Sequence, residues 1–291
     1  MFVHSGAGRT SRWTGTSAKA VRGKTAVPSG DRHAVCQCHR MEDSAASTWP
    51  RLASGLAGTL LGMAAAYAAH FALGVWRAHG YANRAKRYER RLDNASHRLL
   101  IVGDSTGVGL GTSSVEDSLA GRLARDFPHA SIENRAELGA RVACVLGQLA
   151  EVEAPYDAVL IVAGGNDILR RTPHEELQKT LVAVIRRAQA VAPLVIVVNS
   201  GNVGGAPLFS WPLNWVLSRR SLRVRRIFAL TCRQMRAQFV NLTFVPERDH
   251  FARHRELYFA EDGLHPSSAA YAYCYGALKR RTRLTRVLAA A

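Results

Sequence analysis

The stretch Leu99-Leu-Ile-Val-Gly-Asp-Ser-Thr-Gly107 decides the fold of this chain. Its four large aliphatic residues form a short apolar run, and the glycine and polar residues after them favour a turn. The same pattern returns at residues 158–163, ahead of Gly164-Gly165, and at residues 194–198, ahead of Asn199-Ser200-Gly201. Runs that are apolar throughout are typical of strands buried on both faces, so these three stretches predict the centre of a parallel sheet.

Segments with helical spacing separate the three apolar runs. Weaker strand candidates lie at residues 131–134 and 242–245. Helices are expected near residues 115–126, 141–152, 175–191, 221–238 and 267–283. Strands that alternate with helices predict a parallel sheet covered on both faces, because parallel strands need long crossover connections. We therefore expect one α/β domain over residues 98–286.

The chain ahead of this domain divides into three predicted segments. Residues 1–47 contain almost no large aliphatic residues and no apolar periodicity, so they are predicted to be a disordered basic tail. Residues 48–77 are predicted to form a transmembrane helix or signal anchor, because no charged residue interrupts positions 52–76 and a helix of that length crosses a hydrocarbon layer of about 30 Å. Residues 78–97 are rich in arginine and form a predicted basic linker.

Two other interpretations of the apolar helix stay open. A signal sequence would be cleaved after a small-x-small site such as Ala66-Tyr67-Ala68, and an alanine-rich soluble helix has the same composition. For an anchored chain, arginines cluster after the helix rather than before it. The positive-inside tendency then favours the cytoplasmic side for the domain that follows.

The composition of the chain restricts the kinds of function it can have. The 291 residues carry a net charge of +17, and 47% of them are hydrophobic, which suffices for a packed core. Such a charge is a physical basis for a non-catalytic basic module that binds nucleic acid or an anionic membrane. About half of the excess charge lies ahead of residue 98, and no known nucleic-acid motif appears, so no nucleic-acid partner is expected. Five widely spaced cysteines predict neither a disulfide framework nor a structural metal.

Three polar side chains near predicted strand and helix ends suit nucleophilic catalysis. Ligands of an open parallel sheet bind outside the carboxyl ends of its strands. Ser105 follows the first strand in a turn bounded by glycines, which makes it the candidate nucleophile. Asp262 and His265 share a loop ahead of the last helix. A carboxylate three residues before a histidine can accept a hydrogen bond from one ring nitrogen, which leaves the other nitrogen free to take the serine proton.

Candidate donors for an oxyanion follow two other strands. The side-chain amide of Asn166 comes after the 158–163 run, and Gly139 offers a bare backbone N–H after the weaker 131–134 strand. Such donors stabilise the tetrahedral intermediate of acyl transfer. No metal or organic cofactor is expected for this chemistry.

Four blocks of this sequence resemble the SGNH hydrolases, also called GDSL esterases and lipases. The blocks are Gly103 to Ser105, Asn134 to Gly139, Gly164 to Asp167, and Asp262 to Pro266. The resemblance implies a flavodoxin-like three-layer α/β/α sandwich with a five-stranded parallel sheet. It also implies Ser105 as nucleophile, Asp262 and His265 as its partners, and an oxyanion hole made of the Ser105 N–H, the Gly139 N–H and the Asn166 side chain. The first block continues Thr-Gly where Leu-Ser is common in the family, so the subfamily stays open.

The motif Gly103-x-Ser105-x-Gly107 also fits the nucleophile elbow of α/β-hydrolases. Those enzymes place the serine after several strands, with the acid and the histidine on separate loops. Here the serine follows the first strand of the domain, and the acid stands three residues from the histidine. This order favours the SGNH arrangement.

The segment 201–226 is rich in glycine, proline and aromatic residues. We expect an irregular loop there, in which Phe209, Trp211 and Trp215 line an acyl- or lipid-binding surface. A helical hairpin whose aromatic residues cover the core is the alternative.

These observations predict a membrane-anchored serine esterase or lipase that cleaves a carboxylic ester through an acyl-enzyme. The expected substrate is a small-molecule or lipid ester, with an acetyl ester as another candidate. A non-catalytic basic module that binds an anionic membrane or nucleic acid is the alternative function.

Overall fold

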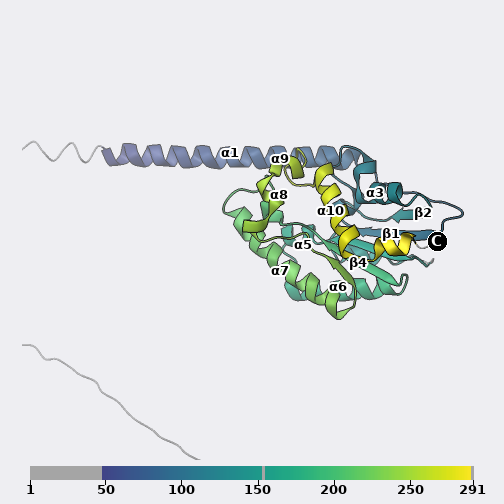
Figure 1. The fold of residues 1–291 in the computed structure, drawn as a ribbon. Helices are drawn as coiled ribbons and strands as arrows, with labels where there is room; N and C mark the ends of the chain where they lie inside the picture. Colours follow the sequence, from purple (N-terminus) through teal and green to yellow (C-terminus); the bar gives the residue numbers. More distant parts are fainter. Residues whose placement is uncertain (1–47, 153–154, 290–291) are drawn as a thin grey trace, which may run out of the picture. The chain divides into compact units, whose positions relative to one another are not determined.

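The computed structural model describes residues 48–152 and 155–289 (Figure 1). The predicted disordered tail at residues 1–47 lies outside the described residues.

The centre of the molecule is a five-stranded parallel sheet with the order β2-β1-β3-β4-β5. The strands are β1 (His97–Gly103), β2 (Ala130–Asn134), β3 (Ala158–Ala163), β4 (Leu194–Asn199) and β5 (Gln238–Val240). This order is that of flavodoxin-like folds. The predicted fold class is therefore confirmed, and the three strongest apolar runs are its central strands.

The last predicted strand was wrong. Residues 242–245 lie beyond β5, which ends at Val240. The Leu242 N–H donates to the Asn199 side chain at 2.8 Å, and the Thr243 hydroxyl accepts from the Asn199 amide at 2.7 Å. Because side chains satisfy these groups, the segment leaves the sheet although its residues favour a strand.

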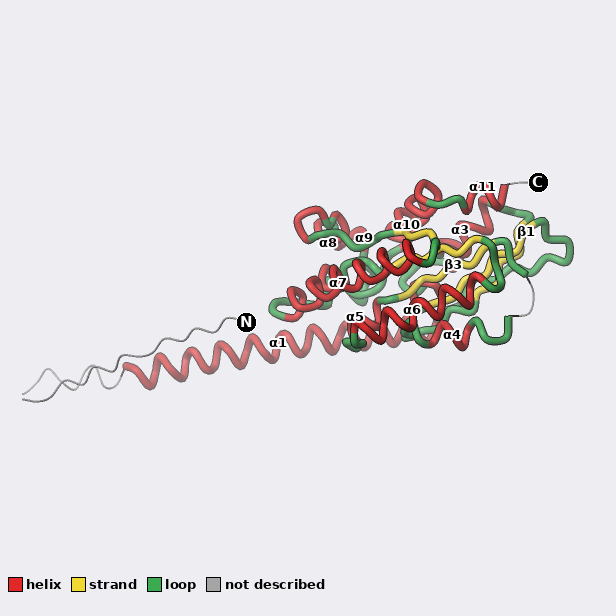
Figure 2. Tube along the Cα trace, turned by 90° about the horizontal axis from the view of Figure 1, so that it is seen from below, coloured by secondary structure: helices red, strands yellow, loops and turns green. Residues whose placement is uncertain are grey.

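Helices cover both faces of the sheet (Figure 2). Alternate strand residues such as Leu100, Val159 and Val197 pack with α4 (Cys144–Gln148), α6 (His174–Gln189) and α7 (Leu213–Gln234). The intervening residues such as Ile101, Leu160 and Ile196 pack with α3 (Leu119–Asp126), α10 (Ser268–Arg281) and α11 (Leu284–Ala289). A strand buried on both sides has no polar face, which explains the uninterrupted apolar runs.

The shorter helices lie at the ends of strands and in the loops. They are α2 (Ser105–Val108), α5 (Gly165–Leu169), α8 (His250–Arg253) and α9 (Arg255–Tyr258), with single 3₁₀ turns at Val115–Asp117, Val203–Gly205 and Pro246–Arg248. Two helix predictions differ from the structure. α4 is shorter than the predicted 141–152, and α7 begins at Leu213, well before the predicted residue 221. Much of the segment expected to be irregular is therefore helix.

A single long helix, α1 (Thr48–Arg84), precedes the sheet and continues past the predicted end at residue 77. Its span from Ala53 to Arg84 is long and apolar enough to cross a membrane. The described residues from Ala57 onward form one compact unit. Within that unit Gly74 is buried beside Leu208, and the Arg77 guanidinium donates to the Glu261 carbonyl at 3.0 Å. The end of α1 thus packs on the α/β domain.

The predicted basic linker contains an arginine that belongs to the fold. Arg90 pairs with Ile132 in an antiparallel bridge beside β2. Its guanidinium donates to the carbonyls of Ala124 at 2.7 Å and Ala130 at 2.8 Å, and also to that of Phe127. These bonds close the end of α3 and the start of β2, so this arginine stabilises the sheet edge rather than facing solvent.

Candidate active site

Ser105 lies in a tight turn directly after the central strand β1. Gly103 has a φ of +140°, and a Cβ at this position would lie 1.8 Å from the Val162 carbonyl oxygen, so only glycine fits. The Asp104 carboxylate caps α2 by accepting a hydrogen bond from the Thr106 N–H at 2.9 Å. Ser105 is the first residue of that helix and is largely buried.

Two side chains that the sequence analysis did not assign hold this turn in place. The Gln148 side chain accepts from the Gly103 N–H at 2.7 Å and donates to the Gly103 carbonyl at 2.9 Å. The Asn134 amide donates to the Gly107 carbonyl at 2.9 Å. Asn134 belongs to the block Asn134 to Gly139 that resembles the family. By contrast, no pattern in the sequence indicates that Gln148 contacts Gly103.

Asp262 and His265 form the expected pair. The His265 Nδ1 and the Asp262 Oδ2 are 2.6 Å apart. The other carboxylate oxygen accepts from the backbone N–H groups of Leu264 at 2.9 Å and His265 at 3.0 Å. Gly263, with a φ of +68°, makes the turn between them. A carboxylate accepts hydrogen bonds, so Nδ1 is the donor in this contact.

The electrostatics of Asp262 keep the carboxylate ionised. Burial raises its pKa, but hydrogen bonds from the His265 ring and from two backbone N–H groups, together with the charge of His265, lower the pKa below its ordinary value. An ionised, hydrogen-bonded carboxylate stabilises the imidazolium that forms when the histidine takes a proton.

The two predicted oxyanion donors lie on neighbouring loops. Asn166, in α5, donates one amide hydrogen to the Ala140 carbonyl at 3.1 Å, which leaves the second hydrogen for a ligand. Gly139 precedes Ala140 and has a φ of +71°. The Asn166–Ala140 hydrogen bond therefore links the loop after β3 to the loop that carries Gly139.

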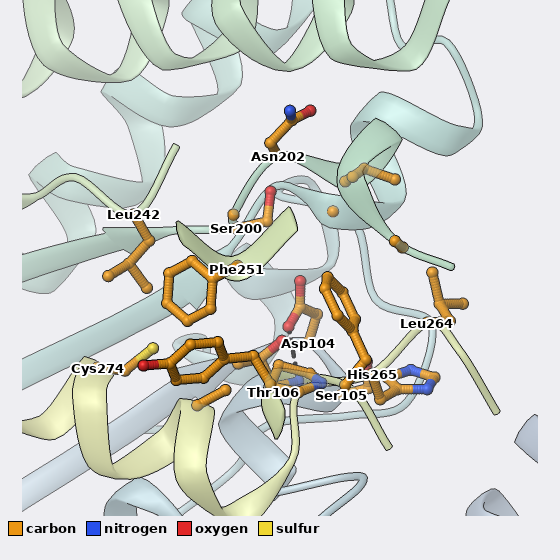
Figure 3. A pocket seen from close by; sticks show the side chains of 18 of the residues that line it. Asp104, Ser105, Thr106, Ser200, Asn202, Leu242, Phe251, Leu264, His265 and Cys274 are labelled. Atoms are coloured by element: carbon orange, nitrogen blue, oxygen red, sulfur yellow. Dashed lines mark hydrogen bonds between the residues drawn. The ribbon is translucent and has the colours of Figure 1, made fainter. Parts of the chain in front are cut away.

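One pocket brings the catalytic candidates together (Figure 3). Ser105, His265 and Asn166 all line it. Its volume is about 140 Å³, and much of its wall is formed by the apolar side chains of Leu242, Phe251, Tyr258, Phe259 and Cys274. Gly139 is not among the residues that line this pocket. The pocket places a serine, a histidine and an amide donor around one space that a small acyl or alcohol group can enter.

The three aromatic residues predicted to bind substrate do not line this pocket. Phe209 is buried in the core, with its ring centroid 6.5 Å from that of Phe71. Trp211 is 78% exposed, and Trp215 lies under the Arg219 guanidinium, 4.3 Å from the ring centroid. Trp215 belongs to α7, which begins at Leu213. Aromatic residues from residues 250–259 form the pocket wall instead.

Asp104 is a buried carboxylate with an altered pKa. Burial raises its pKa to about 6, although hydrogen bonds from Thr106 oppose the shift. The pKa of Asp104 is thus higher in the folded state than in the unfolded state. The neutral carboxyl therefore contributes fully to the free energy of unfolding below pH 4, and this contribution is lost as pH rises through 6.

We expect Asp104→Asn to raise the stability of the protein at pH 7.5, because asparagine can still cap Thr106 but never ionises. The gain in unfolding free energy should reach about 3 kcal/mol at most and vanish near pH 4. Thermal unfolding at both pH values measures it. Asp126→Asn is the matched control with the opposite sign, since hydrogen bonds from Tyr275 and Lys279 lower the Asp126 pKa. An Asp104→Asn protein that is equally destabilised at both pH values would contradict the prediction.

Comparisons with known proteins agree with this geometry. The GDSL-like Lipase/Acylhydrolase family matches residues 101–273. The GDSL-like esterase Rv1075c of Mycobacterium tuberculosis is 28% identical over 197 residues, which are 64% of this chain and 62% of that protein. This chain therefore matches less than two thirds of the length of that relative.

Two solved structures share the fold. The extracellular lipase of Streptomyces rimosus superposes with a TM-score of 0.51 at 17% identity, over 64% of this chain and 100% of that one. LAE5, an α/β hydrolase enzyme from the metagenome of Lake Arreo, Spain, gives a TM-score of 0.50 at 17% identity, over 67% of this chain and 96% of that one. The resemblance to the SGNH hydrolases is confirmed by the family match, which covers more than half of the sequence. The chain belongs to the GDSL-like lipase/acylhydrolase family.

Proposed function

We propose that this protein is a serine hydrolase that cleaves a carboxylic ester through an acyl-enzyme. One observation carries the proposal: Ser105, His265 and Asn166 line a single pocket, and His265 is hydrogen-bonded to the buried Asp262. The test is turnover of p-nitrophenyl butyrate by the full chain in detergent, together with labelling by a fluorophosphonate probe. Labelling of the peptide that contains Ser105 supports the proposal, and an unlabelled, inactive protein contradicts it.

In the proposed mechanism Ser105 Oγ attacks the ester carbonyl carbon while His265 Nε2 takes the hydroxyl proton. Asp262 holds the ring and balances the charge of the imidazolium. The bond from carbonyl carbon to alcohol oxygen then breaks, and the leaving alcohol takes the proton from Nε2. Water attacks the acyl-enzyme, gives a proton to Nε2, and the acid leaves as Ser105 regains its hydrogen.

The Asn166 side chain, with the backbone N–H groups of Ser105 and Gly139, is proposed to stabilise the oxyanion. We expect Asn166→Ala to lower kcat by about 10² to 10³, because loss of one donor destabilises the tetrahedral intermediate more than the bound ester. Steady-state kinetics with p-nitrophenyl butyrate measure kcat and KM separately. Asn214→Ala, which removes an amide that does not line the pocket, is the matched control. An unchanged kcat in Asn166→Ala would exclude this role.

We further propose that α1 anchors the protein to a membrane, with the domain on the cytoplasmic side. Large apolar side chains of the helix are exposed, namely Leu56, Leu60, Leu61 and Met63, each by more than 60% of its surface. Arginines follow the helix, as the positive-inside tendency requires. A membrane location suits a lipid ester as substrate. Recovery of the full chain in the membrane fraction after an alkaline wash supports the anchor, and release into the supernatant contradicts it.

The docked end of the helix yields a stability prediction. A Cβ on Gly74 would lie 2.3 Å from a Leu208 methyl carbon and 3.2 Å from the Asp262 carbonyl oxygen, whereas a Cβ on Gly58 would meet nothing within 4 Å. We expect Gly74→Leu to lower the unfolding free energy by about 1 to 3 kcal/mol through overpacking. Gly58→Leu, the control, should leave the thermal midpoint nearly unchanged. Equal midpoints for the two variants would argue against the packing of α1 on this loop.

A further inference from the structure

Large apolar side chains are exposed where α7 begins. Four of the six residues from 211 to 216 are large and apolar, and Trp211 is 78% exposed while Trp215 is 53% exposed. The other two are the exposed Leu213 and Val216. We name residues 211–216 the apolar tip. A cluster of exposed apolar side chains of this kind points to a partner that covers it.

The segment just before the apolar tip is fixed to α1. The Phe209 ring centroid lies 6.5 Å from that of Phe71. The His70 Nε2 lies 3.3 Å from the Pro207 carbonyl oxygen. All four residues belong to one compact unit. Consecutive Cα atoms are 3.8 Å apart, so the Cα of Trp211 lies within about 8 Å of that of Phe209. The apolar tip therefore begins close to this part of α1.

The length of α1 sets the depth of these contacts in the proposed anchor. Residues 52–69 already span about 27 Å at 1.5 Å per residue, which is close to the hydrocarbon thickness of about 30 Å. Residues 70–76 are therefore expected at the headgroup boundary, and Arg77 is the first charged residue after them. Trp76, which is 70% exposed, stands where interfacial aromatic residues are common. The contacts with α1 thus hold the apolar tip at the membrane surface.

The helix that starts in the apolar tip is strongly basic. α7 contains six arginines and no acidic residue. The exposed Arg219 and Arg223 lie about 6 and 12 Å beyond Trp215 along the helix axis. The Arg219 guanidinium covers the Trp215 ring at 4.3 Å from its centroid. Apolar residues at a helix end, with arginines one and two turns behind them, match a bilayer surface in which anionic phosphates lie above the hydrocarbon.

The apolar tip lies on the same edge of the sheet as the candidate active site. α7 follows β4 and therefore begins at the carboxyl ends of the parallel strands, where the loops after β1 and β3 carry Ser105 and Asn166. The Leu208 N–H donates to the Gly263 carbonyl at 2.9 Å, in the turn between the candidate acid and histidine. A membrane that contacts the apolar tip would therefore lie near the loop of the catalytic pair.

We propose that the apolar tip is a second membrane contact, which inserts Trp211 and Trp215 into the headgroup boundary of an anionic bilayer. Arg219 and Arg223 bind the lipid phosphates above it. This inference goes beyond ester hydrolysis and rests on the proposed anchor in α1. A second copy of this chain is the other candidate occupant. The bilayer is favoured because two copies joined at their tips would bring arginines of like charge together.

The experiment measures tryptophan fluorescence of the full chain in vesicles of phosphatidylcholine and phosphatidylglycerol. The acyl chains carry bromine near the headgroup or carry none, and bromine quenches only tryptophans that reach the hydrocarbon boundary. The emission of the Trp211→Phe/Trp215→Phe variant is subtracted from that of the wild type, so the signals of the other tryptophans cancel. We expect bromine to quench about half or more of the remaining signal. An unchanged thermal midpoint shows that the variant is folded.

Two controls calibrate the quenching. The wild-type signal minus that of Trp76→Phe reports the end of α1 and should also be quenched. Leu230→Trp adds a tryptophan at an exposed position of α7, about 22 Å beyond Trp215, and its added signal should be quenched by less than about a tenth.

The arginines are tested by the same measurement. Arg219→Gln/Arg223→Gln should lower the quenched fraction of the tip signal about twofold, because fewer phosphates are bound. Arg186→Gln/Arg233→Gln is the matched control and should keep the wild-type value. It removes two exposed arginines in the last turns of α6 and α7, at the opposite edge of the sheet.

Four outcomes overturn the inference. Quenching of Trp76 without quenching of the tip tryptophans would leave the anchor in place and remove the second contact. Tip tryptophans that are shielded from aqueous iodide but not quenched by bromine would be covered by a second copy of the chain. An unchanged quenched fraction in Arg219→Gln/Arg223→Gln would exclude phosphate binding. If Trp76 is not quenched either, the anchor fails and this inference fails with it, whereas the proposed ester hydrolysis stands or falls by its own test.

Discussion

Replacement of Ser105 by alanine is expected to lower the kcat for p-nitrophenyl butyrate by about 10⁴ to 10⁶, because the acyl-enzyme can no longer form. The substitution removes only the hydroxyl. The Ser105 carbonyl still accepts from the N–H groups of Gly109 at 3.1 Å and Leu110 at 2.9 Å, so the turn should keep its shape. Residual turnover and fluorophosphonate labelling measure the effect, and an unchanged thermal midpoint shows that the fold is retained.

Ser113→Ala is the matched control for this experiment. Ser113 lies on the loop between α2 and α3 and does not line the pocket, so its loss should change neither activity nor labelling. If Ser105→Ala still reacted with the probe, the nucleophile would be another residue. If the wild type neither reacted with the probe nor turned over esters, the alternative function would be favoured, namely a non-catalytic basic module as the charge of +17 suggests.

The second large effect is expected for Asp262→Asn. Asparagine can still accept from the backbone N–H groups of Leu264 and His265, so the loop should remain folded. Its NH₂ group would face His265 Nδ1 and favour the tautomer in which Nε2 carries the proton and cannot act as a base. The expected loss in kcat is about 10⁴, with little change in KM.

Two further variants complete the test of the pair. His265→Ala should lose at least as much activity as Asp262→Asn, and the double variant should lose little more, because the residues act as one unit. Asp157→Asn removes a carboxylate that accepts from the Arg98 N–H at 2.7 Å at the start of β1, far along the strand from Ser105, and should keep its activity. An Asp262→Asn enzyme with more than a tenth of the wild-type kcat would show that the carboxylate is not required.

Local patterns predicted much of the architecture. The central strands are visible in the sequence because burial on both faces demands apolar residues at every position, as in β3. Asp262 and His265 are close in sequence, and their hydrogen bond needs only the short turn at Gly263. The block around Ser105 is visible in the sequence because each residue has a local role. Gly103 adopts a positive φ, and Asp104 caps the start of α2.

Predictions that depended on the surroundings of a segment were less successful. The strand propensity of residues 242–245 was overridden by hydrogen bonds to Asn199. Trp211 and Trp215 look like ligand-binding residues in the sequence, yet neither lines the pocket, and Trp215 belongs to α7 rather than to an irregular loop. Gln148 gave no signal, because its partner Gly103 lies 45 positions earlier in the chain and only the packing of α4 against β1 joins them.

The sequence by itself determined the central strands, the family blocks and the Asp262–His265 pair, since each depends on spacings of a few residues. Only the tertiary structure decided that Ser105 and His265, 160 positions apart, border one cavity, and that Phe251 and Cys274 wall it. The physical reason is the range of the interactions. Periodicity and capping act within a turn or two of the chain, whereas the walls of a pocket come from strand ends, loops and helices that meet only when the sheet has formed.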